Sequence, residues 1–230
     1  MKRPSRAPRR TILLSLGLAA AVLVGSLSTP KAAEGDTKAA QAAFNAYVDA
    51  LSTKNGEAAA KVVTESTVAF YETMRMAALT APAKEVRAMS FMRMVFVLLL
   101  RVSLEPQQLR DSTARQIFVT AVDRGWIDAG VVARASLGKV STRGDMAVAK
   151  MVVDGKELPL DWHLEREKGT WKNDLVPLVK FADAALGPQL KAMGKEPLDL
   201  AQDVIQAATG KKLPASAWDP PGAAGPRKTK

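Results

Sequence analysis

The sequence predicts an α+β fold, in which N-terminal helices pack on a four-stranded antiparallel meander and two further helices follow it. Apolar residues recur every three or four positions as far as Trp126, which is the period of helices. From there to Val179 they recur at every second position, which is the period of strands, and glycine-containing turns separate the segments. With 230 residues, 47% of them hydrophobic, the chain can bury one core of ordinary size.

Four helices are expected before Trp126. The first starts near Asp36 or Thr37, which both suit an N-cap, and ends at Asn55-Gly56. Its buried side is marked by Phe44, Tyr47, Val48 and Leu51. The other three are expected over residues 57–79, 83–102 and 103–124. The third contains the apolar run 94–100, which is too short to cross a bilayer and predicts a helix buried on most sides.

Four strands are expected after Trp126, over residues 131–142, 146–153, 157–166 and 171–179. Asp154-Gly155 and Lys168-Gly169 suit two-residue type I′ hairpin turns. Two helices are expected next, over residues 181–193 and 198–208. We therefore predict a single α+β domain at residues 34–210 and a flexible basic tail, rich in proline and glycine, at residues 211–230.

The N-terminal segment has the composition of a bacterial signal peptide. Five basic residues lie within positions 1–10, and the 15 residues of Thr11–Gly25 are apolar or small. Because a bilayer span needs roughly 20 apolar residues, a cleaved signal is favoured over an anchor. We expect residues 1–28 to be removed, with a cut as late as residue 33 as the alternative. The predicted location is periplasmic or secreted, and the alternative is tethering to the inner membrane by an uncleaved segment.

Charge and composition exclude several classes of function. The formal net charge is +10, but five basic residues lie within positions 1–10 and three more, Arg227, Lys228 and Lys230, lie at the C-terminal end, which leaves about +2 for the rest of the chain. A nucleic-acid-binding domain would carry a basic stripe on its folded body, so we expect no nucleic-acid partner. The chain has no cysteine and one histidine, which argues against disulfides and against a zinc site. No metal and no cofactor are expected.

The strand at residues 157–166 is the most informative segment. Its alternation places a set of large apolar side chains on the core face, namely Leu158, Leu160, Trp162 and Leu164. The turn at Asp154-Gly155 would set Ala149 opposite Leu160 and Ala147 opposite Trp162. The turn at Lys168-Gly169 would set His163 opposite Asp174 and Leu164 opposite Asn173.

Asp161, His163 and Asp174 are the only candidates for an acid–base site. A carboxylate that orients an imidazole is a known catalytic device. The predicted register nevertheless turns these groups away from the core, where an ordinary cross-strand pair on an exposed sheet face is the simpler interpretation. We therefore predict no catalytic residue.

The core face of the sheet is the candidate for ligand binding. A pocket between sheet and helices would be lined by Trp162, Trp171, Asn173, Leu160 and Leu175, with Asn173 as its polar group. That composition suits an apolar or amphipathic molecule. The alternative is a solid core in which Asn173 bonds to the backbone. Five methionines in the helices are interpreted mainly as core filler, namely Met74, Met76, Met89, Met92 and Met94.

The order of four helices and then a meander with a late Trp-Lys-x-Asp segment resembles the nuclear transport factor 2-like superfamily, also called cystatin-like. The matching residues are Trp171, Lys172 and Asp174, together with the break at Asn55-Gly56, over roughly residues 36–179. The resemblance implies a cone-shaped domain whose curved sheet wraps helices around a cavity. Catalytic members use acidic or histidine residues inside the cone, and this sequence departs from them because His163 and its acidic neighbours alternate outward. It also has two extra helices after the sheet.

These observations together predict an exported, non-enzymatic binding or accessory domain of the cell envelope that holds an apolar or amphipathic small molecule or lipid. One alternative is an isomerase- or dehydratase-like enzyme that uses Asp161 or Asp174 with His163. The other is an accessory or inhibitor subunit of an envelope protein complex, with no pocket. Contact with a membrane is expected only through the N-terminal segment if that segment is not cleaved.

Overall fold

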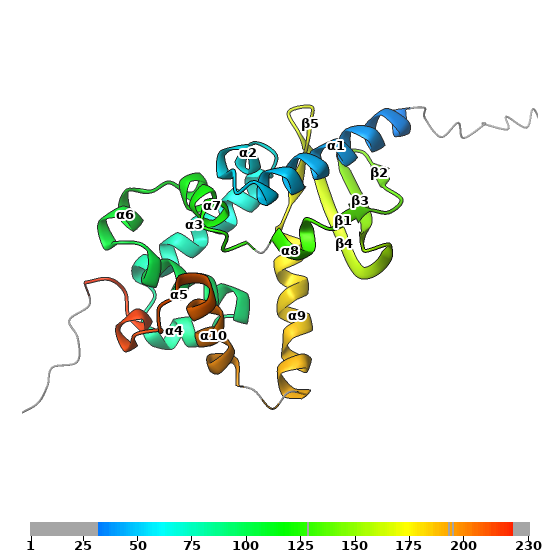
Figure 1. Cartoon of the computed structure of the whole chain (residues 1–230). Helices are drawn as coiled ribbons and strands as arrows, with labels where there is room; N and C mark the ends of the chain where they lie inside the picture. The colour runs from blue at the N-terminus through cyan, green and yellow to red at the C-terminus, as the bar shows by residue number, and fades with distance from the viewer. Residues whose placement is uncertain (1–31, 128, 193, 195, 223–230) are drawn as a thin grey trace, which may run out of the picture. The chain divides into compact units, whose positions relative to one another are not determined.

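The computed structural model describes residues 32–127, 129–192, 194 and 196–222, and it has the predicted α+β architecture (Figure 1). The helices that precede the sheet are α1 (Ala32–Ser52), α2 (Gly56–Lys61), α3 (Glu65–Thr80), α4 (Ala83–Ala88), α5 (Phe91–Ser103), α6 (Pro106–Asp111), α7 (Ala114–Asp123) and α8 (Ala129–Val132). The predicted signal peptide at residues 1–28 lies outside the described residues.

The strands and the elements that follow them complete the described chain. The strands are β1 (Ala135–Leu137), β2 (Ser141–Arg143), β3 (Met146–Val153), β4 (Lys156–Glu167) and β5 (Thr170–Asp174). After them come α9 (Val176–Ala192), α10 (Pro197–Thr209) and the 3₁₀ turn η1 (Ala215–Trp218). The turn η1 falls within the segment predicted to be a flexible tail, yet Ala217 is buried there. Arg101 holds this turn by donating to the carbonyl oxygens of Ala217 and Trp218, at 3.2 and 2.7 Å.

The helices before the sheet are shorter than predicted. The second, third and fourth predicted helices are each divided in two, at residues 62–64, 89–90 and 112–113. Two of these breaks are made by threonine N-caps: Thr64 accepts from the amide of Thr67, and Thr113 forms a capping box with Gln116. The residues on both sides of each break face the same core, so the apolar periodicity continues through the break. The periodicity alone therefore could not reveal where the helices are divided.

The first break is joined to the sheet. Val63 forms an isolated parallel bridge with Asn173, in which the Asn173 amide donates to Val62 at 2.8 Å and the Thr64 amide donates to Asn173 at 3.1 Å. A continuous helix would have needed those same backbone groups for its own hydrogen bonds. The contact with β5 therefore replaces a helical turn at residues 62–64.

The sheet is an antiparallel meander in the order β1-β3-β4-β5, and β2 pairs with the other half of the same β3 edge. The first predicted strand is thus two short strands preceded by the helix α8, and the fourth ends at Asp174, where α9 begins early. Both predicted hairpin turns are present, with positive φ at Asp154, Gly155, Lys168 and Gly169, as type I′ turns require.

The register agrees with prediction between β4 and β5 and differs in part between β3 and β4. His163 lies opposite Asp174 and Leu164 opposite Asn173, as predicted. Beside the Asp154-Gly155 turn the predicted register also holds. A bulge between Lys150 and Val152 then shifts the pairing by two residues, so that Ala149 lies opposite Trp162 instead of the predicted Leu160. The extra residues of β4 include Pro159, which has no amide to donate to a ladder and is tolerated at a bulge.

Helix α1 supplies the layer that covers the core face of the sheet. The Phe44 ring packs edge-on against the Trp162 ring, with 5.0 Å between the ring centres. The centre of the Tyr47 ring lies 5.9 Å from that of Trp162. The shift of two residues keeps every β4 side chain on its predicted face, because side chains alternate with a period of two. Leu160, Trp162 and Leu164 are accordingly buried.

Candidate functional site

The polar face of β4 does not assemble an acid–base site. Asp161 forms an ion pair with Lys150 at 2.7 Å. Asp174 accepts hydrogen bonds from the Ser66 hydroxyl at 3.0 Å and the Val176 amide at 3.1 Å, and so caps the start of α9. Within the described residues, no hydrogen bond or ion pair joins half-buried His163 to either carboxylate.

All five predicted ligand-binding residues are buried, and four of them do not line the groove described below. Asn173 is fully buried, accepts from the Trp162 indole at 2.9 Å, and donates to the carbonyl oxygens of Ala43 and Val62 at 3.0 and 2.8 Å. Its amide group therefore has the backbone partners that the solid-core alternative expected. Leu160 and Trp171 are also buried. The fifth residue, Leu175, lies at the end of the sheet and lines a groove.

That groove, which we call the tyrosine groove, has a volume of about 310 Å³ and lies between helices rather than against the sheet. It is bounded by α1, α3, α5, α8 and α9, and Leu175 is its contact with the end of the sheet. The lining consists of Tyr47, Phe70, Tyr71, Met92, Phe96, Trp126, Ile127, Val132, Leu175, Leu178, Val179 and Ala182. None of these residues carries a charge at neutral pH, and a pocket of this size and composition is typical of a small apolar ligand.

Aromatic packing holds the walls of the tyrosine groove. The Tyr71 ring makes edge-to-face contacts with Phe96 and Phe118, each at 5.0 Å, and a similar contact with Phe70 at 5.6 Å. Such contacts contribute about 0.5–1.5 kcal/mol each beyond simple burial. On the opposite wall, α9 is held to α5 by Asp183, whose carboxylate accepts from the Met92 amide at 2.8 Å. The wall positions are therefore set before any ligand enters.

The only two tyrosines of the chain both line this groove, and no hydrogen bond joins either hydroxyl to the described residues. Tyr47 is 1% exposed and Tyr71 is 6% exposed. Neither hydroxyl is among the fully buried polar atoms that lack a partner in the described residues, so both keep accessible surface in the groove that they line. Burial raises the pKa of both phenols well above the usual value, and repulsion from Tyr71 raises that of Tyr47 further. Both hydroxyls are thus neutral, proton-bearing groups of residues that line the same groove.

Positive charge is found at the edge of the groove rather than inside it. The guanidinium of Arg93 lies 5.8 Å from the centre of the Phe70 ring, and that of Arg124 lies 5.4 Å from the centre of the Trp126 ring. Neither arginine belongs to the lining. An anionic group could therefore meet a cation at the edge but not beside the tyrosines.

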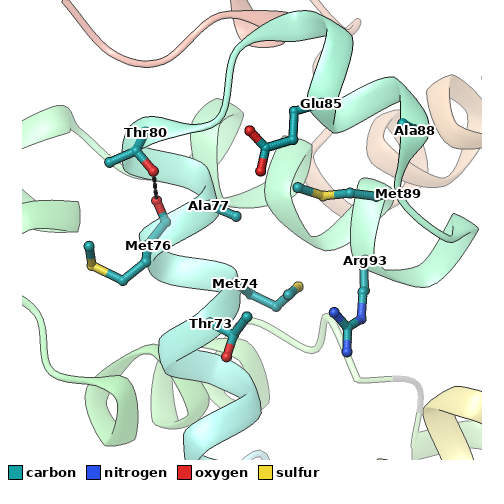
Figure 2. Close-up of a pocket in the computed structure, with 9 residues that line it drawn as sticks. All are labelled: Thr73, Met74, Met76, Ala77, Thr80, Glu85, Ala88, Met89 and Arg93. Atoms are coloured by element: carbon teal, nitrogen blue, oxygen red, sulfur yellow. Dashed lines mark hydrogen bonds between the residues drawn. The ribbon is translucent and has the colours of Figure 1, made fainter.

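A second pocket of about 460 Å³ lies between α3, α4 and the start of α5 and contains three methionines (Figure 2). Figure 2 shows the side chains of Met74 and Met89 pointing toward its interior and Met76 pointing away from it. Glu85 and Arg93 also line this pocket, and Met76 is 44% exposed. The interpretation of the methionines as core filler fits buried Met74 and Met94, whereas Met92 lines the tyrosine groove.

The described residues contain no group of histidine and acidic side chains that could hold a metal ion. Within the same part of the chain, no helix is long and apolar enough to cross a membrane. Comparisons with protein-family models, with curated proteins and with solved structures find no match to this chain.

Sequence reasoning missed the tyrosine groove because its lining comes from five helices that are far apart in the chain. One signal could have indicated it. Both tyrosines occupy apolar helical positions, Tyr47 beside Val48 and Tyr71 beside Phe70, where a phenylalanine would fill the core without adding a polar group.

Proposed function

We propose that the folded body of this protein is an exported, non-enzymatic binding domain that holds an apolar or amphipathic small molecule in the tyrosine groove. The observation that carries the proposal is the combination of a wholly uncharged lining with two tyrosine hydroxyls that no described residue binds. A ligand that accepts hydrogen bonds from these hydroxyls would keep their hydrogen bonding satisfied and would bury apolar surface at the same time.

The chemistry of the lining favours binding over catalysis. General acid–base catalysis needs a group whose pKa lies near the operating pH, and burial moves the pKa of both phenols away from neutrality. The polar residues of the enzymatic alternative, Asp161 and Asp174, are engaged by Lys150, Ser66 and the backbone. Export is supported by the composition of residues 1–28, and the nuclear transport factor 2-like assignment rests on the Trp-Lys-x-Asp resemblance.

A groove-filling variant tests this proposal. Ala182 lies in the lining on α9, whereas Ala184 is exposed on another side of the same helix. We expect A182F to fill the groove and to weaken binding of the neutral dye N-phenyl-naphthylamine at least about tenfold, which corresponds to about 1.4 kcal/mol. A184F, the matched control, should bind the dye as the wild type does. Dye fluorescence titrations measure both affinities, and circular dichroism confirms that each variant is folded.

The proposal fails if the folded wild-type protein does not bind the dye, or if A182F binds it as tightly as A184F. Native mass spectrometry of protein taken from its own cell envelope supplies a second measurement. A retained adduct of small-molecule mass that is lost in A182F would support the ligand-binding function. Protein free of adducts that instead carries a stoichiometric protein partner would favour the accessory-subunit alternative.

A further inference from the structure

The two tyrosine hydroxyls define what kind of polar group a ligand must carry. Tyr47 comes from α1 and Tyr71 from α3, and both reach the same groove. Each phenol can donate one hydrogen bond and can also accept. Among the described residues neither hydroxyl meets an acceptor, and neither is a fully buried atom, so both O–H donors are open to a ligand in the groove.

The surroundings of these donors disfavour a charged ligand group. A carboxylate or phosphate moved into the groove would lose its hydration, and the lining contains no cation to compensate. Arg93 and Arg124 lie close to the groove, but their guanidinium groups pack on the Phe70 and Trp126 rings outside the lining. An anionic amphiphile would therefore leave its head near one of these arginines and place only its apolar part inside.

An uncharged carbonyl avoids that cost. A ketone or ester oxygen has two lone pairs and can accept from two donors at once, and its desolvation penalty is far smaller than that of an ion. We propose that Tyr47 and Tyr71 form a two-donor site for the uncharged carbonyl of an apolar ketone or ester. This inference rests on the binding function proposed above and names the chemical class of its ligand.

Tyrosine-to-phenylalanine variants separate this role from a structural one. Y47F and Y71F keep the ring contacts with Trp162 and Phe96 and remove only hydroxyls that no described residue binds. We therefore expect each variant to unfold at the same urea concentration as the wild type or at a higher one. A hydroxyl kept for stability would give the opposite result, with a lower unfolding midpoint.

Three probes with the same eight-carbon chain test the ligand class by displacement of N-phenyl-naphthylamine: octane, methyl octanoate and octanoate. We expect the wild type to bind methyl octanoate about fivefold to tenfold more tightly than octane, as one or two hydrogen bonds would give. Y47F and Y71F should each lose most of this preference, while their affinities for octane and for the dye stay unchanged. R93Q should leave the ester affinity unchanged.

Two results would overturn the inference. In the first, the preference for the ester over octane persists in the Y47F/Y71F double variant. In the second, octanoate binds more tightly than the ester and loses that advantage in R93Q, which would place the ligand head at the edge of the groove. Failure of the binding function itself looks different, because the dye would then not bind the wild type or would bind A182F equally well.

Discussion

At the scale of single residues, Asn173 joins three parts of the fold. Its backbone bridges Val63, and its side chain bonds to Trp162 on β4 and to the Ala43 carbonyl on α1. A fully buried amide whose groups are all paired stabilises one arrangement of its neighbours, because any other arrangement leaves polar groups unpaired in the core. Asn173 is thus a structural residue at a position where the sequence suggested a ligand contact.

Removing the Asn173 side chain should be costly. We expect N173A to lower the free energy of unfolding by about 3 kcal/mol or more, because it leaves the Trp162 indole and two carbonyl oxygens without this partner. Urea denaturation followed by tryptophan fluorescence measures the change. N45A, at an exposed position of α1, is the control and should change stability by less than about 0.5 kcal/mol. Equal stability of the two variants would contradict this role for Asn173.

The Trp-Lys-x-Asp residues around Asn173 also have structural contacts. Lys172 pairs with Glu167 at 3.2 Å, and Asp174 bonds to Ser66 and caps α9. The Trp171 indole lies 3.5 Å from the Asp36 carboxylate, which itself pairs with Arg166 at 2.8 Å. The segment that carries the family resemblance therefore joins β5 to α1 and α3, and its residue types follow from packing as well as from any shared ancestry.

At the scale of elements, α2 and α7 pack so closely that one of them needs a glycine. A Cβ at Gly56 would overlap the backbone carbonyl oxygen of Val119, and the Gly56 amide donates to the Asp123 carboxylate at 2.7 Å. The Asn55-Gly56 pair was expected to end the first helix. The structure adds a second reason for Gly56, because only a residue without a side chain permits this helix contact.

Gly56 and Gly35 form a matched pair of test positions. We expect G56A to lower the free energy of unfolding by about 1–3 kcal/mol, because the backbone of α7 must shift to accept the methyl group. G35A, on α1 with nothing within 4 Å of its added Cβ, should be neutral or slightly stabilising, since alanine favours helix. Thermal and urea unfolding of both variants measures the difference. A loss of stability in G35A similar to that in G56A would rule out the steric explanation.

Helix starts depend on partners from other elements. The α5 N-cap Ser90 makes no side-chain capping bond, and the free Met92 amide is instead bound by Asp183 of α9. The free Glu65 amide at the start of α3 is likewise bound by Glu167 of β4, at 2.8 Å. Both acceptors are carboxylates, which also suit the positive end of a helix dipole. Sequence patterns placed these helices but could not show the breaks that such distant caps permit.

At the scale of the whole molecule, the proposed export predicts a shortened mature chain. We expect protein recovered from the periplasm of its own host to lack residues 1–28, or residues 1–33 at the alternative cut. Intact mass spectrometry measures the new N-terminus. Either cut leaves Asp36 in the mature chain and thus preserves its ion pair with Arg166. Recovery of the full-length chain from the membrane fraction would support the tethered alternative and contradict cleavage.

Intact mass spectrometry of a variant at Arg9 and Arg10 tests the proposed route of export. Replacing Arg9 and Arg10 by lysine preserves the charge but removes the twin-arginine pair. Processing that stops in this variant would assign the twin-arginine route, and unchanged processing would assign the general secretory route.

The α+β class, the meander, both type I′ turns and the outward face of His163 could all be predicted from the amino-acid sequence, because each depends on residues close together in the chain. A period of two or of 3.6 residues determines which face is buried, and two glycine-containing dipeptides determine where the hairpins turn. The bulge at Pro159, the helix breaks and the tyrosine groove depend instead on the tertiary structure. They arise where distant segments compete for the same backbone groups or enclose an apolar groove, and those contacts exist only after the chain has folded.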